Sequence, residues 1–380
     1  MKAVVWHGKE KLSVDEVADP ALHEPTDAIV RITSTAICGS DLHLYSKFMR
    51  PAMRDGDILG HEPMGIVEAV GSDVKQIQPG DRVVVPFNIA CGACFMCGLG
   101  LQSQCETTQN RKWGKGASLF GYTHLYGAVP GGQAEYLRVP QAHYGPIKVP
   151  EGPPDERFLF LSDVLPTAWQ AVAYAAVPEG GTIGVWGLGP IGQMCARIAL
   201  QRGAGRVIGI DQVPERLALA QRHGVETVDF ASVGDVVAVV REMTNGRGCD
   251  SVIDAVGLEA EGSTFEALLQ ASKLQMDRFH ALRECHDAVR RGGTLSVAGV
   301  YAGYVNLFNL GDLFDRQITI RMGQANVRRW VDDILPLLTD EDPLGTHDLA
   351  THVLPLTEAP RGYEIFQKKE DGAIKVVLRP

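Results

Sequence analysis

The fold of this chain is decided by the stretch Thr182-Ile183-Gly184-Val185-Trp186-Gly187-Leu188-Gly189-Pro190-Ile191-Gly192. Residues 182–186 predict a buried β-strand, and residues 190–202 predict a helix. The G-x-G-x-x-G pattern between them is a weak signal alone. Here it follows a strand and opens a helix, which is the context that a dinucleotide-binding turn requires.

Each glycine of this turn has a separate physical task. Gly187 permits the tight turn, Gly189 lets the backbone approach a pyrophosphate, and Gly192 lets the helix pack closely on the strand. The helix N-terminus then offers unpaired N–H groups to the phosphates. The expected dinucleotide-binding residues of the turn are Gly187, Gly189, Pro190, Ile191 and Gly192.

Asp211 lies nineteen residues after Gly192, at the end of the next predicted strand, residues 206–210. A carboxylate there can accept both ribose hydroxyls of an adenosine and repels a 2′-phosphate, so it favours NAD over NADP. The alternative is a glycine-rich turn followed by an exposed aspartate. Arg216, farther along the chain, either covers the adenine or is a solvated helix residue.

The rest of the chain shows two patterns of predicted secondary structure. From about residue 180, strands and helices alternate, which predicts a parallel sheet wrapped by helices; the further elements are 214–223, 250–254 and 294–297. Residues 1–150 instead carry short β-type runs between glycines and prolines and predict a β-rich, barrel-like domain; examples are 27–32, 65–70, 81–85 and 134–139. Residues 259–275 predict a loop or helical insertion, and residues 373–378 a final strand.

Composition narrows the class of protein. A chain of 380 residues is too long for one ordinary core, so two domains are expected. The net charge of −10 argues against a nucleic-acid partner. No apolar run approaches the ~18 residues that span a bilayer, so no membrane partner is expected. The N-terminus does not resemble a signal peptide, and the cysteines read as reduced, so we expect a cytoplasmic protein.

Four cysteines form the pattern C-x2-C-x2-C-x7-C, at Cys91, Cys94, Cys97 and Cys105. This spacing lets one short loop hold one tetrahedral Zn²⁺ with no position left for substrate, which indicates a structural metal site. An iron–sulfur cluster uses the same thiolates and is an alternative. Two disulfides are a third reading, which the absence of other secretory features disfavours.

A second metal site is suggested by Cys38 and His61, each at the edge of an apolar segment. Asp163 is the leading candidate for a third ligand, since three protein ligands and an open position define a catalytic zinc site. Spacing alone leaves other readings open. His61 fits a core histidine, and Asp163 fits a helix N-cap.

Over essentially its whole length the chain resembles the zinc-dependent medium-chain alcohol dehydrogenases. The resemblance is carried by residues 38–43, Gly60-His61-Glu62, the four-cysteine loop, residues 131–136, the 187–192 turn and Asp211. Residues 120–126 and 162–167 resemble the formaldehyde-dehydrogenase and threonine-dehydrogenase-like branch. In that branch an aspartate replaces the cysteine that many members use as third catalytic ligand.

The resemblance implies roles for the residues around the metal. Cys38, His61 and Asp163 would hold the catalytic zinc, and Glu62 would lie behind it and enter the coordination sphere transiently. Asp41 would accept the second ring N–H of His61. The remaining implied roles are a proton relay from substrate through Ser40 and His43, a nicotinamide contact at Thr167, cofactor-cleft residues Val256, Gly299 and Val300, and a pyrophosphate contact at Lys375. Gly39 departs from several members, which have a basic phosphate-binding residue there.

The implied activity is a zinc-dependent transfer of hydride between NAD and an alcohol, or an aldehyde hydrate or adduct, with two zinc ions per chain. A polyol or threonine-type dehydrogenase shares every motif and stays open. A metal-free or non-catalytic relative would lack the cysteine loop and the Cys38/His61 pair. The loop of residues 110–126 either borders the substrate pocket or is plain surface.

The implied fold is α/β plus β. Residues 1–155 with 325–380 would form a GroES-like β-rich catalytic domain, and residues 156–324 a Rossmann doubly wound parallel-sheet domain, with the active site in the cleft between them. The apolar strand 317–322, at the end of the second sheet, could pair with its copy in another subunit. The resemblance also implies a homo-oligomer, with a tetramer favoured over a dimer.

Overall fold

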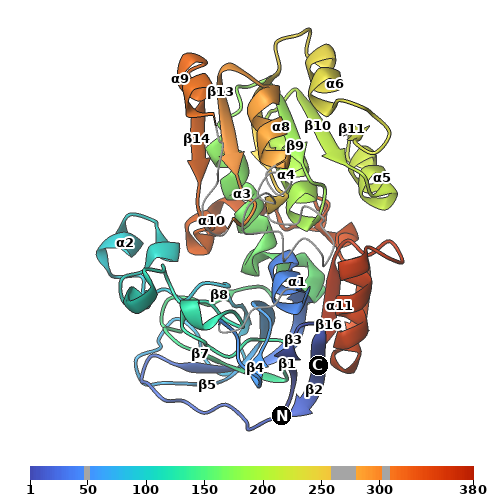
Figure 1. The fold of residues 1–380 in the computed structure, drawn as a ribbon. Helices are drawn as coiled ribbons and strands as arrows, with labels where there is room; N and C mark the ends of the chain where they lie inside the picture. The colour runs from blue at the N-terminus through green and yellow to red at the C-terminus, as the bar shows by residue number, and fades with distance from the viewer. Residues whose placement is uncertain (47–51, 258–279, 302–308) are drawn as a thin grey trace. The chain divides into compact units, whose positions relative to one another are not determined.

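A computed structural model describes residues 1–46, 52–257, 280–301 and 309–380 of the chain. The predicted insertion at residues 259–275 therefore lies outside the described residues. The chain divides into two compact units, one of residues 1–166 with 325–380 and one of residues 167–324 (Figure 1). The first break lies at 166/167, where the sequence analysis places it at 155/156, because residues 156–166 pack with the first unit.

The second unit is built on a six-stranded sheet whose described strand pairs are all parallel. The strand order is β11-β10-β9-β12-β13-β14, so the order reverses between β9 and β12. This confirms the predicted doubly wound parallel sheet. The strands are β9 (Thr182–Trp186), β10 (Arg206–Asp211), β11 (Glu226–Asp229), β12 (Cys249–Asp254), β13 (Val289–Val297) and β14 (Thr319–Met322).

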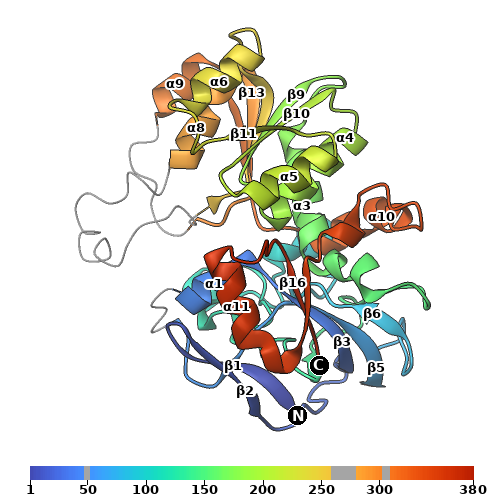
Figure 2. The same cartoon turned by 90° about the vertical axis from the view of Figure 1, so that its right-hand side faces the viewer.

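Helices cover both faces of this sheet. In Figure 2, α4 with α5 lies on one side and α6 with α8 on the other. Side chains of α6 and α8 join the strands in one apolar core around Val240, Val252 and Leu295. The helices of the unit are α4 (Pro190–Gln201), α5 (Pro214–Arg222), α6 (Val236–Met243), α8 (His280–Ala288), α9 (Leu310–Asp315) and most of α3 (Val164–Ala175).

The first unit holds a seven-stranded sheet of order β15-β16-β3-β5-β6-β8, with β7 also paired to β3, and a three-stranded sheet of order β2-β1-β4. The strands of the large sheet are β3 (Ala28–Ile37), β5 (Glu62–Val70), β6 (Arg82–Val84), β7 (Tyr136–Val139), β8 (Ile147–Lys148), β15 (His352–Pro355) and β16 (Val376–Arg379). Those of the small sheet are β1 (Lys2–Gly8), β2 (Lys11–Glu16) and β4 (Asp57–Ile58). The predicted β-rich domain is confirmed.

The helices of the first unit fall partly where the sequence predicted none. They are α1 (Gly39–Ser46), α2 (Phe95–Gly98), α10 (Val327–Ile334) and α11 (Ala359–Lys368). After residue 325 the sequence predicts only a final strand over residues 373–378, but α11 lies between β15 and β16. It buries Tyr363 and Phe366 in one core with Val4 and Ile37. No helix of the described residues is long and apolar enough to cross a membrane.

The register of β3 brings the ends of three strands together. Ala36 of β3 pairs with Glu62 of β5, and Ile37 pairs with Val376 of β16. Cys38 follows Ile37 directly, while His61 and Lys375 directly precede the other two strands. Strand pairing alone therefore places Cys38, His61 and Lys375 at one corner of the sheet.

Asp155 ties β3 to β6 in the same unit. Its Oδ2 accepts hydrogen bonds from Thr33 at 2.6 Å and Ser34 at 2.7 Å, and its Oδ1 accepts one from Arg82. Burial alone would raise the pKa of this carboxyl, but these donors lower it below its usual value. The carboxylate is thus stabilised in its charged form by the fold.

We expect Asp155→Asn to weaken the fold in a pH-dependent way. Because the folded-state pKa lies below the unfolded value, the carboxylate stabilises the protein above about pH 4 and loses this effect as the pH falls through the folded-state pKa. The variant should lose roughly 1–3 kcal/mol at neutral pH and progressively less in acid. Urea unfolding midpoints across this range measure it.

The matched control is Asp340→Asn. Asp340 is an exposed partner of Arg157 at 2.6 Å, and exposed ion pairs contribute about 0–1 kcal/mol. The interpretation fails if the loss in Asp155→Asn is as large at pH 3 as at pH 7.

Candidate active site

Four side chains of the first unit converge at the corner formed by β3 and β5. The potential ligand atoms of Cys38, His61, Glu62 and Asp163 all lie within 4.8 Å of one another. Asp163 Oδ2 is 3.4 Å from Cys38 Sγ and 3.5 Å from His61 Nε2. Zinc bonds of about 2.0–2.3 Å in a tetrahedron separate ligand atoms by about 3.3–3.8 Å. The residues present therefore fit a tetrahedral zinc ion with thiolate, imidazole and carboxylate ligands.

Local backbone geometry directs Asp163 into this group. It lies between a 3-10 helix, Leu159–Ser162, and the start of α3. Its φ of −153° and ψ of −64° differ from the helical values on either side. Its carboxylate is directed at Cys38 and His61, which favours the ligand reading over the N-cap reading.

Two residues of α1 contact His61 and set its orientation. Asp41 Oδ1 lies 3.1 Å from Nδ1, while Asp41 Oδ2 accepts the Cys38 backbone N–H at 3.0 Å. Ser40 Oγ lies 3.2 Å from Nε2. With Nδ1 facing Asp41, Nε2 is the ring atom left to face Cys38 and Asp163. This arrangement matches the role expected for Asp41.

The cluster concentrates acidic groups in a buried place. Burial and the nearby Asp163 carboxylate raise the pKa of Cys38 to about 11. Burial alone would lower the pKa of His61, but Asp41 and the Cys38 thiol raise it well above its usual value. A positive charge at this point is thus strongly favoured, which is what a bound dication supplies.

Lys375 does not occupy the position expected of a pyrophosphate contact. Its side chain is fully buried, and its Nζ donates to Glu62 Oε1 at 2.5 Å and to the carbonyl of Ile37 at 3.0 Å. The pairing register places Lys375 beside Cys38, and the hydrogen bond to Glu62 directs its ammonium toward the candidate ligands. Burial raises the pKa of Glu62, and the ammonium of Lys375 partly offsets this effect. The expectation that Lys375 meets a pyrophosphate does not fit this burial.

Sequence reasoning offered the loop of residues 110–126 as a border of the substrate pocket, but it did not identify the aromatic wall that this loop and Phe87 form beside His61. The rings of Phe87 and Tyr122 both meet the imidazole edge-on, with centroids 6.2 and 6.3 Å away. Burial raises the pKa of Tyr122 to about 12, so its phenol stays protonated. Tyr126 packs against Tyr122 with centroids 5.8 Å apart. The loop of residues 110–126 therefore reaches the candidate metal site at its Tyr122 end.

The four cysteines of the second predicted site also converge. The sulfur atoms of Cys91, Cys94, Cys97 and Cys105 lie within 4.8 Å of one another, around the short helix α2. The structure describes all eight cysteines of the chain, and none forms a disulfide.

Hydrogen bonds to two of these sulfurs favour thiolates, whereas burial and the neighbouring Cys94 and Cys105 raise the pKa of Cys97. Thr107 Oγ1 donates to Cys91 Sγ at 3.1 Å, and the backbone N–H of Glu106 donates to Cys94 Sγ at 3.3 Å. Burial alone would raise the pKa of Cys91, but the Thr107 hydroxyl and backbone N–H groups lower it to about 6. Thiolates are the form in which cysteine binds a metal, so the donor set fits a closed tetrahedral zinc site.

The glycine turn of the second unit has the predicted form. Gly187 has φ +84°, which a residue with a Cβ rarely adopts. At Gly192 an added Cβ would lie only 1.7 Å from the carbonyl oxygen of Gly187, so only glycine allows α4 to start this close to β9. Gly189 is the N-cap of α4, and Pro190 and Ile191 are its first residues.

Asp211 is bound to the turn rather than exposed. Its Oδ2 accepts the backbone N–H of Leu188 at 2.7 Å, and its Oδ1 accepts those of Gln212 and Val213 at 2.8 and 3.0 Å. Arg216 is buried, with Nη1 3.7 Å from Asp211 Oδ2. The reading of Arg216 as a solvated helix residue is therefore wrong.

The remaining predicted residues lie as follows. His43, on α1, and Thr167, on α3, are half-buried. Val256 and Gly299 are half-buried after β12 and β13, and Val300 is 50% exposed. Val256, Gly299 and Val300 follow the carboxyl ends of neighbouring parallel strands, where α/β sheets bind ligands.

We expect Lys375→Met to destabilise the protein by roughly 3–5 kcal/mol, because it leaves the buried carboxylate of Glu62 without its cation. The double variant Glu62→Gln/Lys375→Met should recover much of this loss, because both charges are then removed. Urea unfolding midpoints of the single and double variants measure the coupling. A double variant as unstable as Lys375→Met would show that the pair does not act in this way.

Two family models match the chain: the alcohol dehydrogenase GroES-like domain over residues 24–151 and the zinc-binding dehydrogenase domain over residues 190–275. An uncharacterized zinc-type alcohol dehydrogenase-like protein, AdhB of Bacillus subtilis, is 44% identical over the whole of both chains. The formaldehyde dismutase of Pseudomonas putida is 33% identical and covers all of this chain and 97% of its own.

A solved structure agrees with these matches. The alcohol dehydrogenase TADH from Thermus sp. ATN1 superposes with a TM-score of 0.83 at 37% identity, covering 100% of this chain and 99% of that one. These relatives share the fold that holds the three groups of residues described above. The groups are the converging Cys38, His61 and Asp163, the four-cysteine cluster and the glycine turn. The chain belongs to the zinc-dependent medium-chain alcohol dehydrogenase family and is a zinc-dependent oxidoreductase.

Proposed function

We propose that this protein is an NAD-dependent dehydrogenase that oxidises a short alcohol or a hydrated aldehyde at a catalytic zinc ion. The observation that carries the proposal is the cluster of Cys38, His61 and Asp163, with ligand atoms spaced for tetrahedral zinc. The cofactor half of the proposal is supported by the glycine turn and the Asp211 carboxylate in the second unit.

The catalytic zinc would be held by Cys38, His61 and Asp163. Glu62 would lie behind them and enter the coordination sphere transiently. Bound there, zinc would lower the pKa of a substrate hydroxyl group and so favour hydride transfer to nicotinamide near neutral pH. Asp41 holds the His61 ring by its Nδ1 and keeps Nε2 facing the ligand cluster. Lys375 neutralises Glu62, and both side chains are fully buried.

Protons would leave the substrate through α1. Ser40 Oγ lies next to His61 Nε2, so its hydroxyl is placed to accept a proton from a substrate oxygen at the cluster. His43, one helical turn along α1, would pass that proton to solvent. The aromatic wall of Phe87 and Tyr122 would exclude water from the other side and favour a small substrate.

The dinucleotide would lie along the carboxyl ends of the parallel strands. Its pyrophosphate would face the turn of Gly187, Gly189, Pro190, Ile191 and Gly192. Asp211 would accept the adenosine ribose hydroxyls, and its negative charge disfavours a 2′-phosphate. Arg216, buried beside Gly189, would lie near the adenine. Thr167, Val256, Gly299 and Val300 would contact the nicotinamide half.

The cluster of Cys91, Cys94, Cys97 and Cys105 would hold a second, structural zinc ion. Its four sulfurs leave no open position, and the match to zinc-binding dehydrogenases favours zinc over iron. The unpaired cysteines also fit a reducing compartment such as the cytoplasm.

The substrate is proposed from the branch of the family. The formaldehyde dismutase relative and the aspartate ligand favour a small aldehyde hydrate or primary alcohol. A polyol or threonine-type dehydrogenase is the second candidate, since it would use the same zinc and cofactor sites.

The test is NADH formation from NAD against a substrate panel, with zinc counted on the same protein. The panel holds formaldehyde with and without glutathione, short primary alcohols, sorbitol and threonine. We expect about two zinc ions per chain, as the two clusters require, and turnover of a small alcohol or formaldehyde with NAD in preference to NADP. Turnover of sorbitol or threonine alone would replace the leading substrate, and a strict NADP requirement would contradict the role of Asp211.

Three variants assign the metals. Asp163→Asn should retain about one zinc ion per chain and lose turnover by a factor of at least 100, because a neutral amide is a poor zinc ligand. Cys97→Ser should lose the other ion and unfold at lower urea concentration. Cys195→Ala changes a buried cysteine outside both clusters and should keep both ions. If Asp163→Asn retains both zinc ions, Asp163 is not a zinc ligand.

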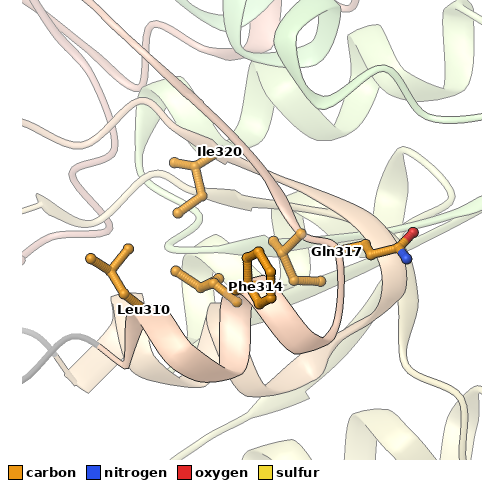
Figure 3. A pocket seen from close by; sticks show the side chains of 6 residues that line it. Leu310, Phe314, Gln317 and Ile320 are labelled. Atoms are coloured by element: carbon orange, nitrogen blue, oxygen red, sulfur yellow. The ribbon is translucent and has the colours of Figure 1, made fainter.

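We also propose that the protein forms a homo-oligomer through the β14 edge of the second unit. No strand of the described residues pairs with the outer edge of β14. Beside it, Phe314 is 88% and Leu310 72% exposed on α9, and Figure 3 shows these side chains beside Ile320 around one apolar hollow. An unpaired edge with apolar side chains suits a two-fold partner, and a second copy supplies the same edge. A tetramer would pair two such dimers.

Light scattering after size exclusion tests this interface. The wild type should have at least twice the 41.1 kDa mass of one chain, and Phe314→Asp should shift it toward the monomer. Phe230→Asp, a partly exposed phenylalanine elsewhere on the same unit, should leave the mass unchanged. A monomeric wild type would contradict the proposal.

A further inference from the structure

A buried carboxylate connects two loops at the carboxyl edge of the six-stranded sheet. Asp254 is the last residue of β12 and is fully buried. Its Oδ1 accepts the backbone N–H groups of Val256 at 2.9 Å and Gly257 at 3.3 Å, and its Oδ2 accepts the hydroxyl of Tyr301. Within the described residues no cationic side chain lies within ion-pair distance of it.

The main chain of the same residue extends this connection. The carbonyl oxygen of Asp254 accepts the N–H groups of Ala298 and Gly299, both at 2.9 Å. Residue 254 thus binds residues 256–257, which follow β12, and residues 298–301, which follow β13. A single residue fixes the spacing of two loops that are far apart in the sequence.

No side chain separates the two loops at Gly257 and Gly299, because there the loops meet backbone to backbone. An added Cβ at Gly257, where φ is +64°, would lie 2.6 Å from the backbone nitrogen of Val300. One at Gly299 would lie 2.3 Å from the nitrogen of Gly257. Among the described residues, the hydrogen bonds of Asp254 join the two loops to each other, while Val256 and Tyr301 also pack against the apolar core of the sheet.

These loops lie beside the glycine turn. Asp254 pairs with Trp186, the last residue of β9, and the Ala255 N–H donates to the Trp186 carbonyl at 2.9 Å. The strand order reverses between β9 and β12, and ligands of α/β sheets bind outside the carboxyl ends of the strands at such a point. A dinucleotide with its pyrophosphate on the turn after β9 would extend its second half over the loops after β12 and β13.

We propose that Asp254 and Tyr301 are positioning residues that hold the two loops in the shape required by the nicotinamide half of the cofactor. The inference rests on the proposed function, since it takes NAD as the ligand. It assigns the pair no contact with the cofactor. Val256, Gly299 and Val300 provide the surface, and the Asp254–Tyr301 hydrogen bond sets its shape.

The experiment compares two probes that differ only in the nicotinamide. NADH and ADP-ribose are titrated by fluorescence and calorimetry into wild type, Tyr301→Phe and Asp254→Asn, with the zinc content checked throughout. Tyr301→Phe should weaken NADH binding about tenfold and ADP-ribose binding less than twofold. Asp254→Asn keeps an acceptor for the two N–H groups and should weaken NADH binding by an intermediate factor.

Val240→Ala is the matched control. Val240 is fully buried in the same core but lies on α6, away from this edge of the sheet. It should lower the thermal midpoint at least as much as Tyr301→Phe and leave both affinities unchanged. If Val240→Ala and Tyr301→Phe have the same ratio of NADH affinity to ADP-ribose affinity, Asp254 and Tyr301 only stabilise the fold. That result would overturn the proposal.

The two hypotheses fail in different ways. If the wild type binds neither NADH nor ADP-ribose, the proposed cofactor is wrong and the inference falls with it. If the wild type binds both and Tyr301→Phe weakens both equally or neither, the cofactor stands and the inference alone is overturned.

Discussion

The pairing of β3 with two antiparallel neighbours is the constraint on which the metal site depends. β5 and β16 flank the end of β3, and its last residues pair with Glu62 and Val376. The side chains next to these pairs, Cys38, His61 and Lys375, are therefore brought together by backbone hydrogen bonds before any metal is bound. A one-residue slip would turn each side chain to the opposite face of the sheet and disperse the site.

The charge of this corner explains why it suits a dication. Three buried acids and a thiol gather there, namely Asp41, Glu62, Asp163 and Cys38, and Lys375 is the fully buried ammonium that faces them. Burying this many acidic groups is unfavourable unless cations accompany them. Lys375 compensates one carboxylate and leaves the rest for a metal ion. The raised pKa of Cys38 reports the same imbalance.

Local patterns predicted the second unit well, because its signals are contained in short stretches. The strand and helix around the glycine turn follow the sequence closely, and Asp211 ends β10. The sequence also predicted both groups of candidate metal ligands. The spacing of the cysteines indicated one group, and Asp163 with the family resemblance indicated the other. Partners from distant segments could not be predicted. Lys375 meets Glu62 across 313 positions, and nothing local indicates that its ammonium turns inward. The contact of Tyr122 with His61 could not be predicted for the same reason, although the loop that carries Tyr122 was named as a possible border of the pocket. Asp254 was missed, although an acid that ends an apolar strand is a signal worth noting.

The hydrogen bonds of Asp211 have a consequence for how cofactor preference can change in this family. One carboxylate supports the glycine turn, through the N–H of Leu188, and under the proposed function it would also repel a 2′-phosphate. A substitution that removes this carboxylate would also remove the acceptor of the Leu188 N–H. A lineage that moved toward NADP would be expected to keep an acceptor here and to add positive charge from a neighbouring segment. If NAD is the cofactor, as proposed, the hydrogen bonds of Asp211 would tie the preference for an unphosphorylated ribose to the rigidity of the turn.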